Sequence, residues 1–307
     1  MTEPQNRRIE RVSVLANPTS GHGNGEHAAE VAITRFHQLG IDVRAVVGRD
    51  AAHARELVDE ELAAGTDAMV VVGGDGIIHL ALQSLAGGDV PLGIIPAGTG
   101  NDHAREFGLP TKDPAAAADV VAAGWAETID LGRVDRDGAP PTWFGSVMAS
   151  GFDSLVSDRT NRMTWPHGRM RYNLAIVAEL TKLRMLHYRL TFDDGDPIET
   201  DLTLVAFGNT RSYGGGMRIC PGADRSDGLL DVTMTNSASR LKLITLFPKV
   251  FSGKHVELDE VITTRVRTAR VECPGINAYA DGELIGPLPV TVSAVPGALR
   301  VILPPVG

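Results

Sequence analysis

The sequence predicts an α/β protein in two domains. An N-terminal domain built on a parallel β-sheet is expected over residues 1–130, and a larger antiparallel β-sandwich domain over residues 131–307. Short apolar runs alternate with helical segments from Arg11 to Ile95, which is typical of βαβ units around a parallel sheet. After about Asp130, longer β-like runs separated by turn residues favour an antiparallel sandwich. This interpretation allows the last strands to pack back on the first domain.

The first domain is expected to contain four buried strands separated by helices. The strands are VSVLA, VRAVV, MVVV and LGII, and the helices are HAAEVAITRFHQLG and AAHARELVDEELAAG. A further helix is expected to start in AAAAD after Pro114, because proline is favoured in the first turn of a helix. Ligands of such sheets bind at the carboxyl ends of the strands, so the loops beginning at Asn17, Gly73 and Pro96 should share one rim.

The second domain is expected to consist mainly of strands. They are WFGSVMA, YRLTF, TDLTLVAFGN, LLDVTMT, ITTRVRTARVEC, LPVTVSA and LRVIL, with turn signals such as DDGDP between them. Two helices interrupt this pattern, MRYNLAIVAELTKLRML and SRLKLITLFPKVF. The second could touch a membrane with its apolar face, although such a stripe more often faces the protein core.

Composition and charge exclude several classes of protein. The net charge of −9 and the lack of a Lys/Arg cluster argue against nucleic-acid binding. Cys220 and Cys273 are too few for a disulfide framework, which favours a reducing cytoplasm. Because no apolar run reaches the roughly 20 residues of a membrane span, any contact with a membrane is expected to be peripheral.

Three loops rich in glycine and small polar residues follow the predicted strands: NPTSGHGNG at Asn17–Gly25, GGDG at Gly73–Gly76 and PAGTGNDHAR at Pro96–Arg105. Such turns can offer backbone N–H groups to a phosphate, and Asp75 and Asp102 would bring carboxylates to the same place. The alternative is that the glycines only satisfy tight turns while Asn101 caps a helix. His103 is expected to contact a ligand, to cap a helix or to lie on the surface.

These motifs carry a resemblance to a known family. GGDG and PLGIIPAGTGNDHAREFGLP, together with NPTSG, GGGMRICPGADRSDGLLDV and ADGE, resemble the diacylglycerol and lipid kinases, especially the soluble bacterial diacylglycerol kinases. The resemblance covers most of the chain in order. It implies an ATP-binding first domain and a lipid-binding second domain. It also implies an ATP-dependent kinase that phosphorylates the free hydroxyl of diacylglycerol, or of a related lipid, to give phosphatidic acid.

The resemblance also implies residue roles. Asp75 would help to organise a catalytic Mg²⁺, and Glu283 would be the general base with Asp281 beside it, although the choice between these two acids stays open. A second, structural Mg²⁺ would be held by Asp224, Asp227 and Leu229. The residues implied in ATP binding are Asn17, Pro18, Thr19, Ser20, Gly21, Gly73, Gly74, Asp75, Gly76, Ile77, Ile78, His79, Gly98, Thr99, Asn101 and Asp102.

The sequence departs from the family pattern at some ATP contacts. Ile77 stands where the family commonly has Thr, and Gly48 stands where some relatives have Thr. The alternatives to a lipid kinase are an NAD kinase, which shares GGDG, and a nucleotide-binding module without catalysis, which the change at Ile77 suggests. As a lipid kinase, the protein is expected in the cytoplasm, transiently associated with the inner face of the membrane. Its partner is the lipid substrate, with a homodimer left open.

Overall fold

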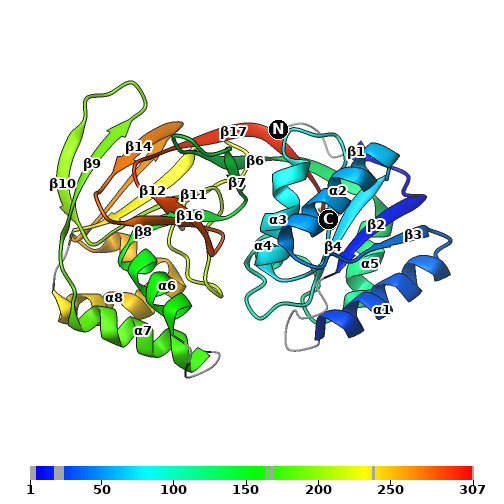
Figure 1. Cartoon of the computed structure of the whole chain (residues 1–307), viewed down its shortest axis with the longest axis horizontal. Helices are drawn as coiled ribbons and strands as arrows, with labels where there is room; N and C mark the ends of the chain where they lie inside the picture. Colours follow the sequence, from blue (N-terminus) through cyan, green and yellow to red (C-terminus); the bar gives the residue numbers. More distant parts are fainter. Residues whose placement is uncertain (1–4, 17–23, 164, 166–168, 237–238, 306–307) are drawn as a thin grey trace. The chain divides into compact units, whose positions relative to one another are not determined.

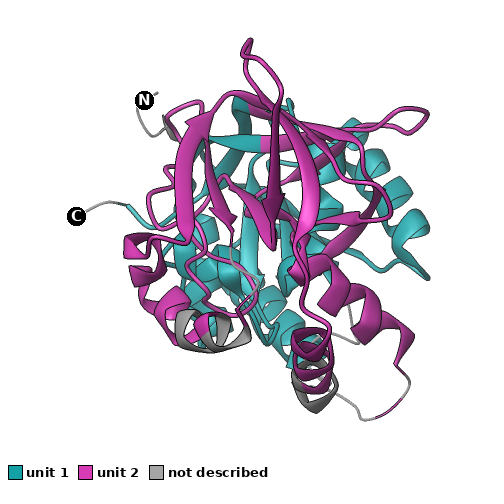
Figure 2. Ribbon diagram, turned by 90° about the vertical axis from the view of Figure 1, so that its left-hand side faces the viewer, with its two compact units in different colours: residues 1–131, 295–307 teal, residues 132–294 magenta. Residues whose placement is uncertain are grey.

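The computed structural model describes residues 5–16, 24–163, 165, 169–236 and 239–305. The chain divides into two compact units, residues 1–131 with 295–307 (unit 1) and residues 132–294 (unit 2) (Figure 2). The C-terminal segment 295–307 therefore groups with the first unit. Unit 1 has a parallel sheet and unit 2 is built of antiparallel sheets, so the predicted fold class is confirmed.

Unit 1 is a sheet of parallel strands with helices between them (Figure 1). The order β3-β2-β4-β5 is parallel throughout, and Val301 of β17 pairs with Leu92 of β5, also in parallel. The elements are β1 (Gln5–Asn6), β2 (Arg11–Ala16), α1 (Asn24–Gln38), β3 (Asp42–Val46), α2 (Ala51–Ala64), β4 (Ala68–Gly73), α3 (Asp75–Leu85), β5 (Leu92–Pro96), α4 (Asp102–Glu106), α5 (Pro114–Ala123) and the first part of β6 (Trp125–Asp135).

Local sequence explains the elements of unit 1. Strand β4, AMVVVG, is buried at every position, as expected for a central strand covered on both faces. Helix α5 begins after Asp113, whose carboxylate accepts hydrogen bonds from the amides of Ala115 and Ala116, and ends at Gly124 with φ 68°. The central strands thus bring the loops after Gly73 and Pro96 to one edge of the sheet.

Unit 2 contains two antiparallel sheets around one apolar core. One sheet has the order β13-β12-β11-β8-β15-β16, and the other contains β10-β9-β14-β17. The elements are β7 (Thr142–Phe144), β8 (Val147–Gly151), α6 (Phe152–Arg162), α7 (Arg169–Thr181), β9 (Leu186–Phe192), β10 (Ile198–Leu202), β11 (Leu204–Gly208), β12 (Leu230–Thr235), α8 (Arg240–Ser252), η2 (Lys254–Glu257), β13 (Val261–Val266), β14 (Thr268–Glu272), β15 (Asn277–Ala280), β16 (Glu283–Pro287) and β17 (Val290–Ile302).

The core of unit 2 combines residues from both sheets. Tyr188 and Val292 of one sheet join Met148 and Phe207 of the other, and all four side chains are fully buried. Interdigitated apolar side chains of two facing sheets are the physical basis of a β-sandwich. In the predicted strand WFGSVMA, Phe144 and Met148 are buried in this core, whereas Trp143, for which a core position was also expected, is only half-buried.

Several predicted strand boundaries in unit 2 are wrong. TDLTLVAFGN forms two strands, β10 and β11, which belong to different sheets. ITTRVRTARVEC likewise divides into β13 and β14 in different sheets, whereas LPVTVSA and LRVIL belong to the single strand β17. Helix α6 was not predicted, and α7 ends at Thr181 rather than at Leu186. The apolar runs do form strands, but the points where the chain passes from one sheet to the other were not predicted.

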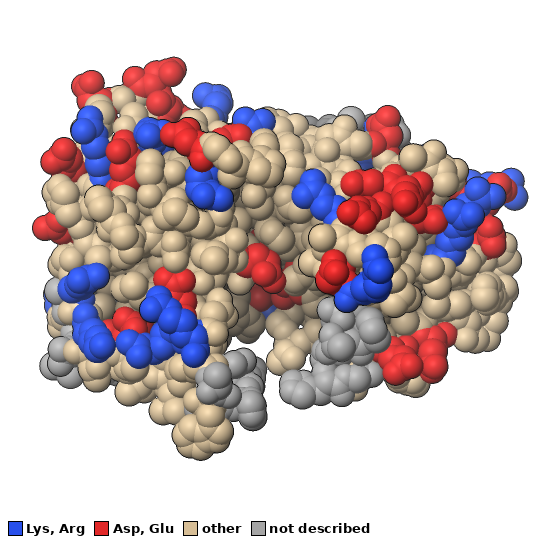
Figure 3. Space-filling model, in the orientation of Figure 1, with Lys and Arg blue, Asp and Glu red and all other residues tan. Residues whose placement is uncertain are grey.

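Charge is unevenly distributed on unit 2. In the face shown in Figure 3, Lys and Arg gather at the lower left, where Figure 1 draws α6 and α7. This concentration contrasts with the chain as a whole, whose net charge is −9. In the part of the chain that the structure describes, no helix is both long and apolar enough to cross a bilayer.

Candidate active site

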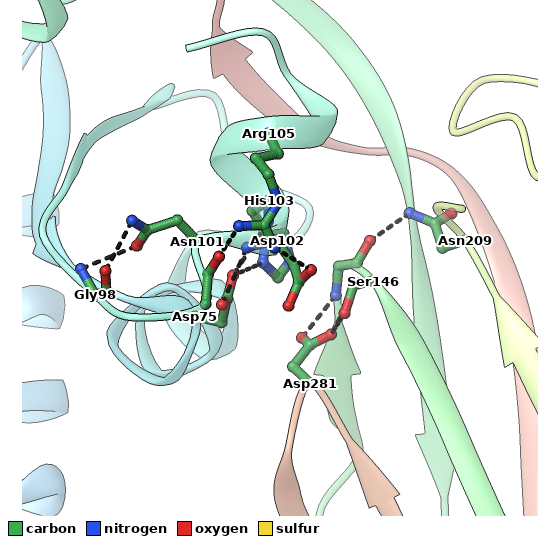
Figure 4. Close-up of polar contacts among 11 residues, drawn as sticks. Asp75, Gly98, Asn101, Asp102, His103, Arg105, Ser146, Asn209 and Asp281 are labelled. Carbon is green, nitrogen blue, oxygen red and sulfur yellow. Dashed lines mark hydrogen bonds and ion pairs between the residues drawn. The ribbon is translucent and has the colours of Figure 1, made fainter. Parts of the chain in front are cut away.

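Asp75 joins two of the glycine-rich loops of unit 1, Gly73–Gly76 (the first loop) and Pro96–Arg105 (the second loop). It is the first residue of α3, directly after β4, and its carboxylate accepts hydrogen bonds from the second loop (Figure 4). Oδ2 accepts from the amide of Asp102 at 3.1 Å, and Oδ1 accepts from the amide of His103 at 3.1 Å. The Nδ1 atom of His103 lies 3.0 Å from the same Oδ1. Asp75 therefore holds the start of α4 against the start of α3.

The surroundings of Asp75 favour its ionised form. Burial by itself would raise the pKa of this carboxyl, but the hydrogen bonds and charge interaction with His103, together with the Asp102 amide, outweigh burial and lower the pKa. The side chain of Asp75 keeps 19% of its surface exposed, whereas that of His103 keeps 2%. The site thus presents a fixed, partly accessible carboxylate.

Glycine is required where the two loops approach each other. A Cβ on Gly98 would lie 2.4 Å from the Cα of Gly74, and a Cβ on Gly100 would lie 2.9 Å from Oδ2 of Asp75. Asn101 closes the turn by accepting from the Gly98 amide at 2.9 Å and donating to the Gly98 carbonyl at 2.9 Å. Gly98 is therefore needed for close contact between the two backbones, and Gly100 leaves room for the carboxylate of Asp75; both requirements exist before any ligand binds.

Asp102 and the residues around it complete the second loop. Its carboxylate is 5% exposed and lies 2.6 Å from the guanidinium of Arg105, which also donates to the carbonyl of Gly100. His103, for which a surface position was one of the alternatives, is instead buried against Asp75, and Arg105 was not predicted as a site residue. A histidine that is in contact with Asp75 carries no signal in the sequence, because the contact depends on two turns that are 28 positions apart.

The residues predicted to bind ATP have different exposures. Thr99 is exposed at the tip of the second loop, while His79 and the side chains of Ile77 and Ile78 are buried on α3. Gly74 is the N-cap of α3 and provides no side-chain cap, so the first amides of that helix are not capped by a side chain. Asn17, Pro18, Thr19, Ser20 and Gly21 lie outside the described residues.

The DGE stretch of unit 2 is a hairpin turn between β15 and β16. Asp281 and Gly282 both have positive φ, 51° and 87°, and Ala280 pairs with Glu283 across the turn. The turn directs Asp281 inward, where Oδ2 accepts from the Gly145 amide at 2.9 Å. Oδ1 accepts from the amide of Ser146 at 2.8 Å and from its hydroxyl at 2.6 Å (Figure 4).

Asp281 and Glu283 therefore differ in their surroundings. Asp281 is 8% exposed and both of its oxygens accept hydrogen bonds, whereas Glu283 is exposed at the start of β16. Asn209 extends the buried network, because it donates to the carbonyl of Gly145 at 3.0 Å. A fully engaged carboxylate holds backbone segments together, and an exposed one is available to a substrate.

Asp224 and Asp227 lie in the loop before β12, and their carboxylates accept hydrogen bonds from other residues of that loop. Asp224 accepts from the amide and the hydroxyl of Ser226, and Asp227 accepts from the amide of Leu229 at 3.0 Å. Arg265 lies 3.5 Å from Asp227 and also contacts Asp231 and the Gly222 carbonyl. The described residues contain no group of three or more His, Cys, Asp and Glu side chains arranged to hold a metal ion.

Both units match models of known protein families. Residues 11–134 match the diacylglycerol kinase catalytic domain, and residues 146–303 match the YegS C-terminal NAD kinase beta sandwich-like domain. A diacylglycerol kinase from Mycobacterium tuberculosis is 61% identical over 306 residues, which cover 99% of each chain. The chain belongs to the diacylglycerol kinase family. It is accordingly an enzyme, as the motifs of the sequence predicted.

More distant relatives share the fold of this family member. A diacylglycerol kinase from Bacillus subtilis is 28% identical, covering 96% of this chain and 97% of its own. A crystal structure of a diacylglycerol kinase from Bacillus anthracis has a TM-score of 0.71 at 19% identity, covering 97% and 98%. An NAD kinase from Archaeoglobus fulgidus, solved in complex with ATP, has a TM-score of 0.53 at 15% identity, covering 95% and 93%. That NAD kinase thus shares this fold.

Proposed function

We propose that the protein transfers the γ-phosphoryl group of ATP to the free hydroxyl of diacylglycerol, giving phosphatidic acid. The relative from Mycobacterium tuberculosis, 61% identical over nearly the whole chain, bears the name of this activity. The observation that carries the proposal is the carboxylate of Asp75, held in its ionised form where the two glycine-rich loops meet. A carboxylate beside the N-terminal amides of α3, which no side chain caps, suits the binding of a nucleoside triphosphate and its metal ion.

The loops of unit 1 would bind the nucleotide. The N-terminal amides of α3, which lack a side-chain cap, can donate to phosphate oxygens, and the exposed Thr99 can contribute its hydroxyl. Because Ile77 is buried, its side chain would contribute to the core, and only its amide could face a phosphate. Catalysis of phosphoryl transfer depends mainly on such positioning and on charge neutralisation.

Asp75 fits a role as a ligand of nucleotide-bound Mg²⁺. Oδ2 accepts a hydrogen bond from the amide of Asp102, and the side chain is 19% exposed, so a second lone pair can face an ion that arrives with the phosphates. When bound, Mg²⁺ would neutralise charge on the transferred phosphoryl group. The second, structural Mg²⁺ fits less well, because Arg265 already lies against the carboxylates of Asp227 and Asp231.

Glu283 is our candidate for the general base. It is exposed, whereas the neighbouring Asp281 is buried and accepts three hydrogen bonds from Gly145 and Ser146. The hydroxyl of diacylglycerol is a weak nucleophile at neutral pH, so a carboxylate that accepts its proton contributes about 10²- to 10⁴-fold to the rate. Asp281 would act as a positioning residue that holds the hairpin on which Glu283 stands.

The test is a transfer assay with labelled ATP and a panel of acceptors: diacylglycerol, monoacylglycerol, phosphatidylglycerol, sphingosine and NAD. We expect label in phosphatidic acid. Glu283→Gln should lower kcat by about 10²- to 10⁴-fold with little change in the KM for ATP. Asp75→Asn should abolish turnover and also loosen α4, because Asp75 anchors the amides of Asp102 and His103. Label only in NADP would instead identify an NAD kinase.

A further inference from the structure

A basic cavity lies between α6, α7 and the segment that follows α7. Its volume is about 410 Å³, and all of its walls belong to unit 2. The lining residues are Leu155, Arg159, Arg162, Met163, Glu179, Lys182 and Arg184. None of them belongs to the glycine-rich loops or to the DGE hairpin, so the candidate active site does not account for this cavity.

The lining of the cavity carries an excess of positive charge. Four of its side chains are cationic and only Glu179 is anionic, and Glu179 is paired with Arg159. Arg162 lies 3.8 Å from Asp158 and its side chain is 80% exposed. Across the described residues, neither Lys182 nor Arg184 forms an ion pair with a carboxylate. The cavity therefore has cationic groups available for an external anion, in a chain whose net charge is −9.

Exposed apolar side chains accompany this charge. Trp165, which precedes α7, is 74% exposed, and Leu174 and Val177 on α7 are 43% and 57% exposed. Leu174 and Val177 are three positions apart, so they share one face of the helix, while Ala175 is fully buried. Unit 2 therefore carries exposed apolar groups as well as the basic cavity, and surfaces that lie on anionic membranes combine these two features.

Helix α8 adds a second apolar group in the same unit. Phe247 and Phe251 are 43% and 47% exposed and stack edge to face, with ring centroids 5.6 Å apart. Half of the ten large apolar side chains exposed in the described part of the chain come from α8, α7 and Trp165. In Figures 1 and 2 the helices of unit 2 lie below its strands, so α7 and α8 are at the same end of the unit.

We propose that this end of unit 2 docks on a bilayer, with the phosphate of an anionic phospholipid bound in the basic cavity. Trp165, Leu174 and Val177 would enter the interfacial layer, and Lys182 and Arg184 would contact the headgroup. The proposal rests on the lipid-kinase function, because an enzyme whose substrate lies in a bilayer must reach it. Charge and apolar contact are two weak membrane signals, and their combination gives reversible binding.

The test is flotation with vesicles of phosphatidylcholine, with and without anionic phosphatidylglycerol. We expect salt-sensitive binding to the anionic vesicles. Each basic residue near an anionic surface strengthens binding about fivefold, so the double variant Lys182→Gln/Arg184→Gln should bind about 25-fold more weakly. The matched control, Arg189→Gln/Arg270→Gln, removes the same charge from exposed positions on β9 and β14 and should bind like the parent.

Trp165 provides a direct readout of docking. Its emission should shift to shorter wavelength when anionic vesicles are added, and Trp165→Phe should remove that shift. Equal vesicle binding by the parent and the Lys182→Gln/Arg184→Gln variant would overturn the proposal. So would tight binding of inorganic phosphate, lost in this variant, without any binding of the parent to vesicles, because the cavity would then be a site for a free anion.

Activity assays separate this proposal from the proposed function. On a short-chain, water-soluble diacylglycerol, the Lys182→Gln/Arg184→Gln variant should turn over like the parent, whereas on vesicle-borne substrate its rate should fall with its binding. If the parent phosphorylates no lipid, the proposed function fails. If it phosphorylates the soluble substrate and the variant loses nothing on vesicles, the docking surface alone fails.

Discussion

Replacement of Asp281 by Asn tests the distinction between the two acids of the DGE hairpin. The carboxylate accepts from the amides of Gly145 and Ser146 and from the Ser146 hydroxyl, at 2.9, 2.8 and 2.6 Å. Asn presents one oxygen and one NH₂ group. In either orientation the NH₂ group faces at least one backbone N–H, so two donors meet and one buried hydrogen bond is lost.

The expected cost follows from that hydrogen bond. Loss of a charge-assisted hydrogen bond costs about 1.5–3 kcal/mol, and the easier burial of a neutral amide offsets part of this, which leaves about 2 kcal/mol. For a unit of the size of residues 132–294, this corresponds to a fall in Tm of about 4–8 °C. Glu283→Gln, at an exposed position on the same hairpin, should change Tm by less than about 2 °C.

Calorimetry of the parent and both variants measures these shifts, and hydrogen exchange at the amides of Gly145 and Ser146 locates them. Ser146→Ala should cost about 1 kcal/mol in the parent and less in the Asp281→Asn background, because the two residues share a hydrogen bond. If Asp281→Asn unfolds at the temperature of the parent but loses turnover, the reasoning is refuted. Asp281 would then act in the chemistry itself.

Three further results are expected. Gly98→Ala should separate the two glycine-rich loops and weaken ATP binding in equilibrium titrations, because its Cβ would lie 2.4 Å from the Cα of Gly74. His103→Gln should raise the pKa of Asp75, because His103 helps to lower it. In the parent, the stabilising contribution of the ionised Asp75 is present above about pH 4 and is lost on acidification. In the variant, urea unfolding at a series of pH values should show this loss of stability at higher pH. Burial raises the pKa of Asp153 to about 6, so the folded protein favours the neutral carboxyl. This contribution to stability is present below about pH 4 and is lost as pH rises through 6. Asp153→Asn, which is neutral at every pH, should therefore raise Tm at neutral pH but not at about pH 4.

Local patterns in the sequence were sufficient for the architecture of unit 1. An apolar run such as MVVV indicates a strand whose side chains are buried on both faces of the sheet, and its position between helical segments predicts a parallel sheet. The same reasoning placed Asp75 and Asp102 at neighbouring strand ends, where the structure brings their loops together. The family was indicated separately, by the resemblance of continuous sequence motifs to those of known lipid kinases.

Long-range contacts decided what the patterns could not. The break between β13 and β14 at Arg267 depends on Asp193, whose carboxylate accepts from the amides of Arg267 and Thr268 at 2.8 and 2.9 Å. That carboxylate comes from a turn 74 positions earlier, so nothing in ITTRVRTARVEC itself marks the point where the chain changes sheets. An alternating pattern records which face of a strand is buried, but not which partner its backbone will meet.

The orientation of individual side chains in the candidate site has the same origin. DGE predicts a turn, but the inward direction of Asp281 follows from positive φ at two successive residues and from donors at Gly145 and Ser146. The contact of His103 with Asp75 likewise requires that two loops be brought together by the sheet. A hydrogen bond between distant residues forms only after the chain has folded around it, and for that reason residue types and their spacing do not reveal it.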